Sequence, residues 1–153
     1  MHTISTRLLL GFLAGVLSHL IFQGAFGGIL YAAHIIPNLP WSLEPVPPLG
    51  VPKAFSLGFW AGLWGVVYAL LEPRLSVRFG WWLGGLVFGI APVLVLWFVV
   101  LPLKGLGVGG GFHPAMVPIA ISSHLLFGLG TAIFFRTGLA LARRGGSREA
   151  PNR

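Results

Sequence analysis

Two histidines in apolar surroundings are the residues of this chain best suited to chemistry. Each follows a serine and precedes a leucine, in the stretches Ser18-His19-Leu20 and Ser123-His124-Leu125. An imidazole within a membrane can ligate haem iron or copper, link two helices by a hydrogen bond, or line a path for protons or solutes. At 100° per residue, neighbouring polar residues share helical faces with these imidazoles, and we expect a polar seam of Ser18, His19, Gln23, Ser123, His124 and Thr131.

Two further histidines, His34 and His113, lie toward the other ends of the same apolar segments. If these segments are antiparallel helices, His19 faces His124 at mid-depth and His34 faces His113 nearer the surface. Two histidines on facing helices are the ligands of a bis-imidazole haem. Three hypotheses therefore stay open for the inner pair: a hydrogen-bonded link between helices, a haem b or copper site with the outer histidines as a second ligand pair, or part of a solute or proton path.

Other groups that carry catalysis are missing or scattered. The chain has three acids and no cysteine. No serine–histidine–acid set is expected, because Glu44 and Glu72 are predicted on opposite sides of a membrane, where Glu72 is expected to pair with Arg74, Arg78 or a neighbouring chain end. The glycines at 105–111 lack the Lys-Ser/Thr ending of a phosphate-binding loop. We therefore expect no catalytic residue and no enzyme, unless the chain is a haem-bearing subunit of a redox complex.

The composition places these residues in a lipid bilayer. Of 153 residues, 56% are hydrophobic and 8% are charged, and the mean hydropathy is +0.88. A soluble domain carries about 25% charged residues, so a soluble globular enzyme is excluded. The net charge of +7 does not indicate nucleic-acid binding, because the cations lie at the ends of apolar runs and form no basic face. The expected partner is lipid, with no nucleic acid.

Four apolar segments are long enough to cross a membrane as helices. The prolines from Pro37 to Pro52 follow the first segment and are too dense for a helix or a strand. A polar turn at 72–79 follows the second, and glycines at 105–111 follow the third. We expect an all-α four-transmembrane-helix bundle with spans at Leu8–Tyr31, Ala54–Leu71, Gly80–Leu103 and Ala115–Arg136.

The basic residues predict the orientation of this bundle. All eight arginines belong to the side that holds both termini and the 72–79 turn, whereas the other side holds only Lys53 and Lys104. Because short cytoplasmic loops are rich in Lys and Arg, both termini are expected in the cytoplasm and the protein in the inner membrane. The bundle is expected to occupy 1–142, followed by a disordered basic tail at 143–153.

Small residues predict where the helices pack, because they let backbones approach closely in lipid. In the second span, Trp60, Trp64 and Tyr68 fall opposite a stripe of small residues and are expected to face lipid or a partner. The first span also contains Gly24-x-x-x-Gly28. We expect close helix packing at Gly11, Gly15, Gly58, Gly62, Gly65, Gly84 and Gly128.

Several short stretches also form a family resemblance. They are Gly65-Val66-Val67-Tyr68 in the segment that ends at Pro73, Gly84-Gly85, Val100-Leu101-Pro102-Leu103 and Ser123-His124-Leu125. In their order along the chain they resemble the YagU-type family of small, uncharacterised bacterial inner-membrane proteins. The resemblance implies the same membrane topology and assigns no catalytic residue.

These observations favour a small membrane protein without catalytic machinery, which acts as a homo-oligomer or as an accessory subunit of a larger membrane complex. One alternative is a histidine-ligated haem b or copper protein for electron transfer. The other is a small-solute channel or transporter whose path contains His19, Gln23 and His124. Such a path favours neutral or anionic solutes, because no acid lies within any predicted span.

Overall fold

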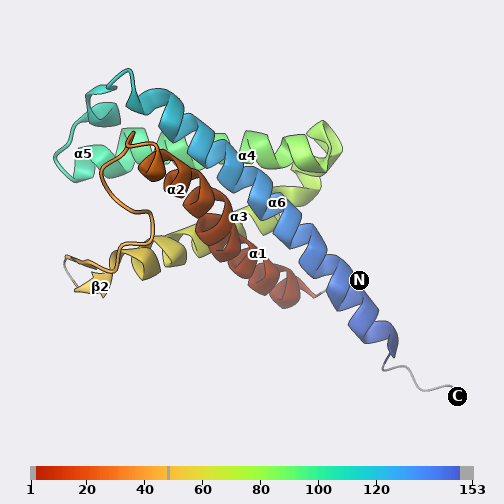
Figure 1. The fold of residues 1–153 in the computed structure, drawn as a ribbon. Helices are drawn as coiled ribbons and strands as arrows, with labels where there is room; N and C mark the ends of the chain where they lie inside the picture. Colours follow the sequence, from red (N-terminus) through yellow and green to blue (C-terminus); the bar gives the residue numbers. More distant parts are fainter. Residues whose placement is uncertain (1–2, 48, 149–153) are drawn as a thin grey trace, which may run out of the picture.

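The computed structural model describes residues 3–47 and 49–148, with the backbone alone for 145–148 (Figure 1). The described chain is all-α apart from one small hairpin, and it has four helical stretches that are long and apolar enough to cross a membrane. The four predicted segments are thereby confirmed as helices of membrane-spanning length. The elements are α1 (Ile4–Ser18), the π-helical η1 (His19–Gln23), α2 (Gly24–Ala32), β1 (Pro45–Val46), β2 (Val51–Pro52), α3 (Lys53–Phe79), α4 (Trp81–Val95), the π-helical η2 (Leu96–Val100), α5 (Leu101–Leu103), the 3₁₀-helical η3 (Val108–Gly111) and α6 (Met116–Arg148).

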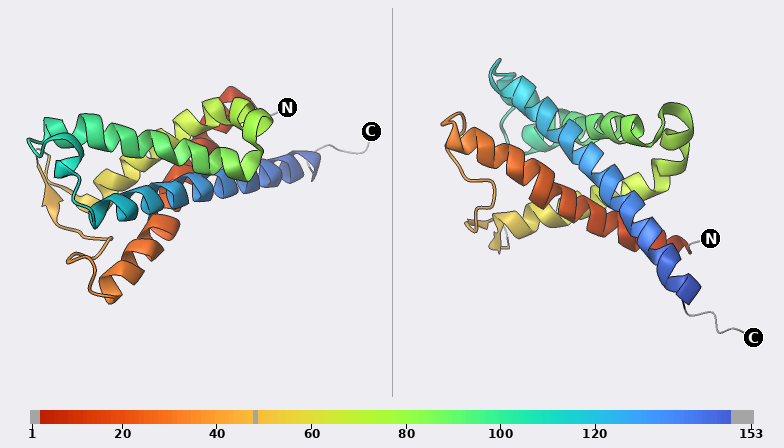
Figure 2. Two further views of the ribbon diagram at one scale, coloured as in Figure 1. Left: turned by 90° about the horizontal axis from the view of Figure 1, so that it is seen from above. Right: turned by 45° about the vertical axis from the view of Figure 1, so that its right-hand side comes forward.

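The helices form a bundle in which α1 packs against both α3 and α6, and α4 packs against α6 and α3. Figures 1 and 2 show that the start of α1, the turn between α3 and α4, and the end of α6 lie at one end of the bundle. The β-hairpin, α5 and η3 lie at the other end. The arginines of the described chain are therefore gathered at one end, and Lys53 and Lys104 at the other.

The backbones of α1 and α3 touch at glycines. A Cβ added to Gly11 would lie against the carbonyl oxygen of Gly65, and a Cβ added to Gly15 against the carbonyl oxygen of Ala61. Gly62 leaves room for a phenylalanine ring of α1. At Gly11 and Gly15 no side chain fits between the two helices, so the contact there depends on residues without a Cβ.

The contact between α4 and α6 is built in the same way, although not every predicted glycine takes part in such a contact. A Cβ added to Gly128 of α6 would lie against the carbonyl oxygen of Gly85 in α4. Gly84 lies against Leu75 at the end of α3. A Cβ added to Gly58 would meet nothing within 4 Å, so the prediction of close packing is wrong at Gly58.

The prediction that Tyr68 faces lipid together with Trp60 is also wrong. The Tyr68 side chain is 0% exposed, whereas Trp60 is 59% exposed. The Tyr68 ring packs edge-on against Phe88 of α4, with ring centres 5.1 Å apart, and against Phe135 of α6 at 5.7 Å. α3 packs on α1 through its glycines, and on α4 and α6 through this ring. It is therefore buried on two sides around Tyr68.

The polar turn predicted at 72–79 is instead helical, and α3 continues to Phe79, after which Gly80 has a φ of 76°. Pro73 has no N–H to donate to the carbonyl oxygen of Ala69 one turn earlier. The Arg7 guanidinium of α1 donates to that oxygen over 3.1 Å. A side chain from another helix thus replaces the missing bond, which explains why the proline does not end α3.

The dense prolines of the first loop do not exclude a strand, contrary to the prediction. β1 and β2 pair antiparallel, with Pro45 opposite Pro52 and Val46 opposite Val51. Prolines are tolerated at the ends of an isolated two-stranded ladder, where few N–H groups are needed. The N–H of Gly50 closes the turn by donating to the Val46 carbonyl oxygen over 3.0 Å.

The last helix is longer than the fourth predicted span. α6 continues to Arg148, well beyond the expected end at Arg136. The part of the predicted disordered tail between 143 and 148 is therefore helical, and the rest of it, 149–153, lies outside the described residues. The added length extends α6 past the other helices at the arginine-rich end (Figure 1).

Candidate functional site

The two inner histidines lie on helices that contact one another. His19 is the first residue of η1 in the first span, and His124 lies in α6, against which both α1 and η1 pack. Gln23 Nε2 donates a hydrogen bond of 3.2 Å to Ser123 Oγ, next to His124. The expected polar seam between the first and last spans is therefore assembled at the level of η1.

Each of these imidazoles is held through its Nδ1 atom. His19 Nδ1 lies 2.8 Å from Gln23 Oε1, and His124 Nδ1 lies 2.8 Å from the carbonyl oxygen of Ala120. A carbonyl oxygen only accepts hydrogen bonds, so Nδ1 carries the hydrogen in both rings. In the neutral form of each ring, Nε2 then carries a lone pair that can accept a hydrogen bond or ligate a metal.

The inner part of the seam is closed. Ser18 and Thr131 are both fully buried, and both hydroxyls donate to the carbonyl oxygen of Phe127, over 2.6 Å and 2.8 Å. Because these side chains are fully buried, their hydroxyls are not accessible to a solute. The available polar groups of the seam are those nearer the hairpin end, around His19 and Gln23.

Trp41 fixes the first loop against η1. Its indole N–H donates to the carbonyl oxygen of Leu20 over 3.1 Å. A π-helical turn shifts the backbone hydrogen-bond register and leaves a carbonyl available to such a donor. The indole lies on Gly24, where an added Cβ would be 2.5 Å from Nε1, so the Gly24-x-x-x-Gly28 pattern accommodates this side chain and not another helix. Sequence reasoning missed this contact because no spacing signals it.

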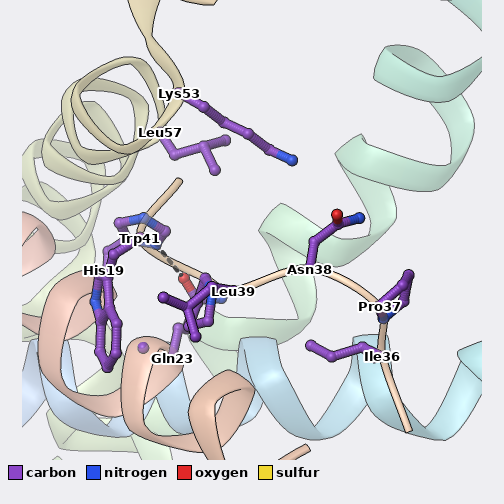
Figure 3. Close-up of a pocket in the computed structure, with 11 residues that line it drawn as sticks. His19, Gln23, Ile36, Pro37, Asn38, Leu39, Trp41, Lys53 and Leu57 are labelled. Atoms are coloured by element: carbon purple, nitrogen blue, oxygen red, sulfur yellow. Dashed lines mark hydrogen bonds between the residues drawn. The ribbon is translucent and has the colours of Figure 1, made fainter. Parts of the chain in front are cut away.

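The loop that Trp41 holds down lines a half-open pocket of about 290 Å³ beside His19. Residues 36–41 of the loop, Lys53 and Leu57 of α3, Gln23 of η1 and Gly24 of α2 complete its lining. Figure 3 shows Lys53 and Leu57 on one side of this space and the hydrogen-bonded pair of His19 and Gln23 on the other. The pocket therefore combines the Lys53 cation, a polar floor formed by His19 and Gln23, and mainly apolar walls.

Lys53 is the pocket residue that the sequence indicated only as a topology signal. Its N–H is fixed to the hairpin by a 2.9 Å bond to the carbonyl oxygen of Glu44. Its side chain is half-buried, and the ammonium group forms no ion pair within the described residues. The sequence signal that could have indicated Lys53 is its place as a single lysine at the start of an apolar helix, on the side of the bundle that has few cations.

The outer histidines are not brought into a ligand pair. His34 follows α2 with a left-handed φ of 58° and is exposed. His113 is also exposed, and its carbonyl oxygen accepts the N–H of Met116 at the start of α6 over 2.8 Å. Within the part of the chain that the structure describes, no three His or acid side chains are grouped to hold a metal ion. Haem or copper on His19 and His124 stays a prediction, tested by an absorption spectrum and metal analysis.

A second polar cluster lies at the arginine-rich end of the bundle. Glu72 Oε2 is 3.0 Å from the Arg7 guanidinium, and Glu72 Oε1 accepts the hydroxyl of Ser76 over 2.9 Å. The carboxylate thus pairs with α1, and not with Arg74 or Arg78 of its own helix. Residues two apart point to different sides of a helix, so Arg74 is poorly placed to reach Glu72.

No protein-family model matches the chain, and neither a curated protein nor a solved structure is similar to it. The resemblance to the YagU-type family therefore stays a prediction. The function has to be inferred from the residues of the pocket and the seam, and from the end of the bundle at which each of them lies.

Proposed function

We propose that the protein is a small-solute transporter of the inner membrane, without catalytic machinery, which receives a neutral or anionic solute in the pocket over His19. The observation that carries this proposal is the double role of Gln23. It lines the pocket and donates to Ser123 of α6, so a solute at the base of the pocket contacts the polar seam between the first and last spans directly.

The charges of the bundle support solutes that are not cationic. The Lys53 ammonium faces the pocket without an ion pair among the described residues. Glu72, the carboxylate that lies within a membrane-length helix, is already engaged by Arg7 at the far end. A cation would therefore find a like charge at the mouth of the pocket and no counter-charge at its base.

The polar contacts also support an arrangement that is open at one end and closed at the other. The pocket lies at the hairpin end. Deeper in the seam, the buried Ser18 and Thr131 hydroxyls donate to the carbonyl oxygen of Phe127. Passage of a solute would require α1 to move relative to α6, as in alternating access. By the positive-inside rule, the arginine-rich end is cytoplasmic and the pocket faces outward.

Solute passage is tested with purified protein in liposomes. A panel of small organic acids, sugars and amines is added outside, and vesicle shrinkage and re-swelling are followed by light scattering. We expect faster re-swelling than in protein-free liposomes for at least one neutral or anionic solute. His19→Leu and Gln23→Leu should each slow that solute about tenfold or more, because each removes part of the pocket base.

The matched control is His34→Leu, since His34 is an exposed loop histidine. This variant should retain the wild-type rate. Re-swelling no faster than in protein-free liposomes would overturn the proposal, and so would equal rates for wild-type and His19→Leu protein. A solute specificity limited to amines would contradict the charge argument.

A homo-oligomer or an accessory subunit is a second candidate, favoured by the rings on the outer half of α3. Phe55, Phe59 and Trp60 are 67%, 53% and 59% exposed, which provides an aromatic face for another transmembrane helix. Light scattering of the protein–detergent complex gives the number of chains. An oligomer that becomes a monomer on Trp60→Leu substitution, but not on Trp82→Leu substitution, would favour this candidate.

A further inference from the structure

One end of the pocket is suited to an anionic group. Lys53 is half-buried, and the exposed Glu44 carboxylate forms no ion pair with it in the described chain. Lys53 is also the first residue of α3, but the N–H groups of Lys53 and Ala54 already donate to the carbonyl oxygens of Glu44 and Ser42. The Lys53 ammonium is therefore the group at this end of the pocket that can receive an anion. Asn38 also lines this pocket.

The walls of the pocket are suited to a flat apolar body. They are formed by the Trp41 indole, Leu39 and Leu57, and by the rings of Pro37 and Pro40. An indole face and proline rings are rigid surfaces against which an aromatic ring packs well. A volume of about 290 Å³ lies at the lower limit of ligand pockets, which fits a single ring with small substituents.

The base of the pocket is suited to a hydrogen-bond donor. His19 Nδ1 is occupied by Gln23 Oε1, so the neutral imidazole has its lone pair on Nε2. The Gln23 amide is itself engaged on both sides, by His19 and by Ser123. A hydroxyl group is the small substituent that donates to such an acceptor without adding charge.

We propose that the solute is a hydroxylated aromatic carboxylate, with its carboxylate at Lys53, its ring against Trp41 and its hydroxyl at His19. This inference rests on the proposed function, because it names the solute class of the same pocket. It combines three separate features of the pocket, one for each part of the molecule, and each part can be removed from the ligand independently.

Binding of 4-hydroxybenzoate to the purified full-length protein in a non-ionic detergent tests this inference by calorimetry. The comparison compounds are benzoate, which lacks the hydroxyl, 4-hydroxybenzamide, which lacks the charge, and octanoate, which lacks the ring. Wild-type protein should bind 4-hydroxybenzoate about fivefold more tightly than benzoate, as expected for one hydrogen bond. It should bind 4-hydroxybenzoate about tenfold more tightly than the amide.

Two variants assign the ends of the ligand. Lys53→Gln should abolish the preference for the acid over the amide, whereas the matched control Lys104→Gln, in the other loop at the same end, should retain it. His19→Leu should abolish the preference for 4-hydroxybenzoate over benzoate. Both readouts are affinity ratios measured within one variant, so an overall loss of affinity does not obscure them.

Several results would overturn the inference: no binding of 4-hydroxybenzoate, equal affinity for the acid and the amide, tighter binding of octanoate, or equal effects of the Lys53 and Lys104 substitutions. These results leave the liposome experiment untouched, because that experiment uses a panel of solutes and depends on His19 and Gln23. Conversely, tight binding of 4-hydroxybenzoate without any solute flux would remove transport and retain the ligand class.

Discussion

Gln23 of η1 and Ser123 of α6 are joined by a 3.2 Å hydrogen bond between their side chains. The same glutamine holds His19 through its other amide atom. A single side chain thus orients the imidazole at the base of the pocket and links the first span to the last one. Such bonds between membrane helices contribute about 1 kcal/mol on average.

A double-mutant cycle on Gln23 and Ser123 should reveal this link. Gln23→Leu and Ser123→Ala should each lower the free energy of unfolding by about 1 kcal/mol, typical of a hydrogen bond between membrane helices. The double variant should lose less than the sum of the two, because either change alone already breaks the bond. Thermal or denaturant unfolding in detergent gives the values. Purely additive losses would show that the two side chains do not interact.

The glycine contact between α1 and α3 predicts opposite effects for two glycines of one helix. Gly65→Ala should destabilise the protein by about 1–3 kcal/mol, because the new methyl group would be forced against the backbone of Gly11. Gly58→Ala is the matched control, since a Cβ there meets nothing within 4 Å. It should leave the stability unchanged or raise it by about 0.5 kcal/mol through helix propensity. Equal melting temperatures for the two variants would contradict the packing.

The Tyr68 hydroxyl is fully buried and has no hydrogen-bond partner among the described residues. An unsatisfied buried hydroxyl costs about 1–3 kcal/mol, whereas the ring itself fills the space between Phe88 and Phe135. Tyr68→Phe should therefore raise the melting temperature. Tyr31→Phe removes an exposed hydroxyl and should have no effect. A lower stability of Tyr68→Phe would indicate that the hydroxyl is bonded in the membrane, for example to a bound water molecule.

The ion pair between Arg7 and Glu72 is largely shielded, with side chains that are 23% and 13% exposed. Glu72→Gln should cost about 2 kcal/mol, less than the 3–5 kcal/mol typical of breaking a fully buried pair. Arg7→Met should cost more, because it also removes the donor that satisfies the Ala69 carbonyl beside Pro73. Glu44→Gln serves as the control on an exposed carboxylate. A larger loss of unfolding free energy for Glu72→Gln than for Arg7→Met would contradict this account.

The four spans and the polar seam could be predicted from the sequence because both depend on local pattern. Apolar length alone marks the membrane helices, and the helical period places Gln23 on the same face as His19. Gly11, Gly15 and Gly65 could be recognised as packing sites for the same reason. In each case the information lies within one helix.

The features that were missed depend on contacts between distant parts of the chain. Arg7 sustains α3 through Pro73, although it bonds to a residue 62 positions away. Tyr68 is buried because α4 and α6 cover it, which the periodicity of α3 alone does not reveal. Trp41 and Lys53 line one pocket with His19 only because the proline-rich loop folds back on η1. No spacing rule connects these positions before the chain is folded.

The π-helical turn at His19–Gln23 sets the direction in which each half of the first span faces. Because a π turn holds about one residue more than an α turn, the two halves of this span are rotated by about 100° relative to an uninterrupted helix. Gly11 is thereby directed at α3 while Gly24 receives the Trp41 indole. Deleting one residue here would restore an ordinary helix and misalign one of these two contacts. In related chains, an unchanged residue count between the two glycines would therefore mark those that retain the loop over the imidazole.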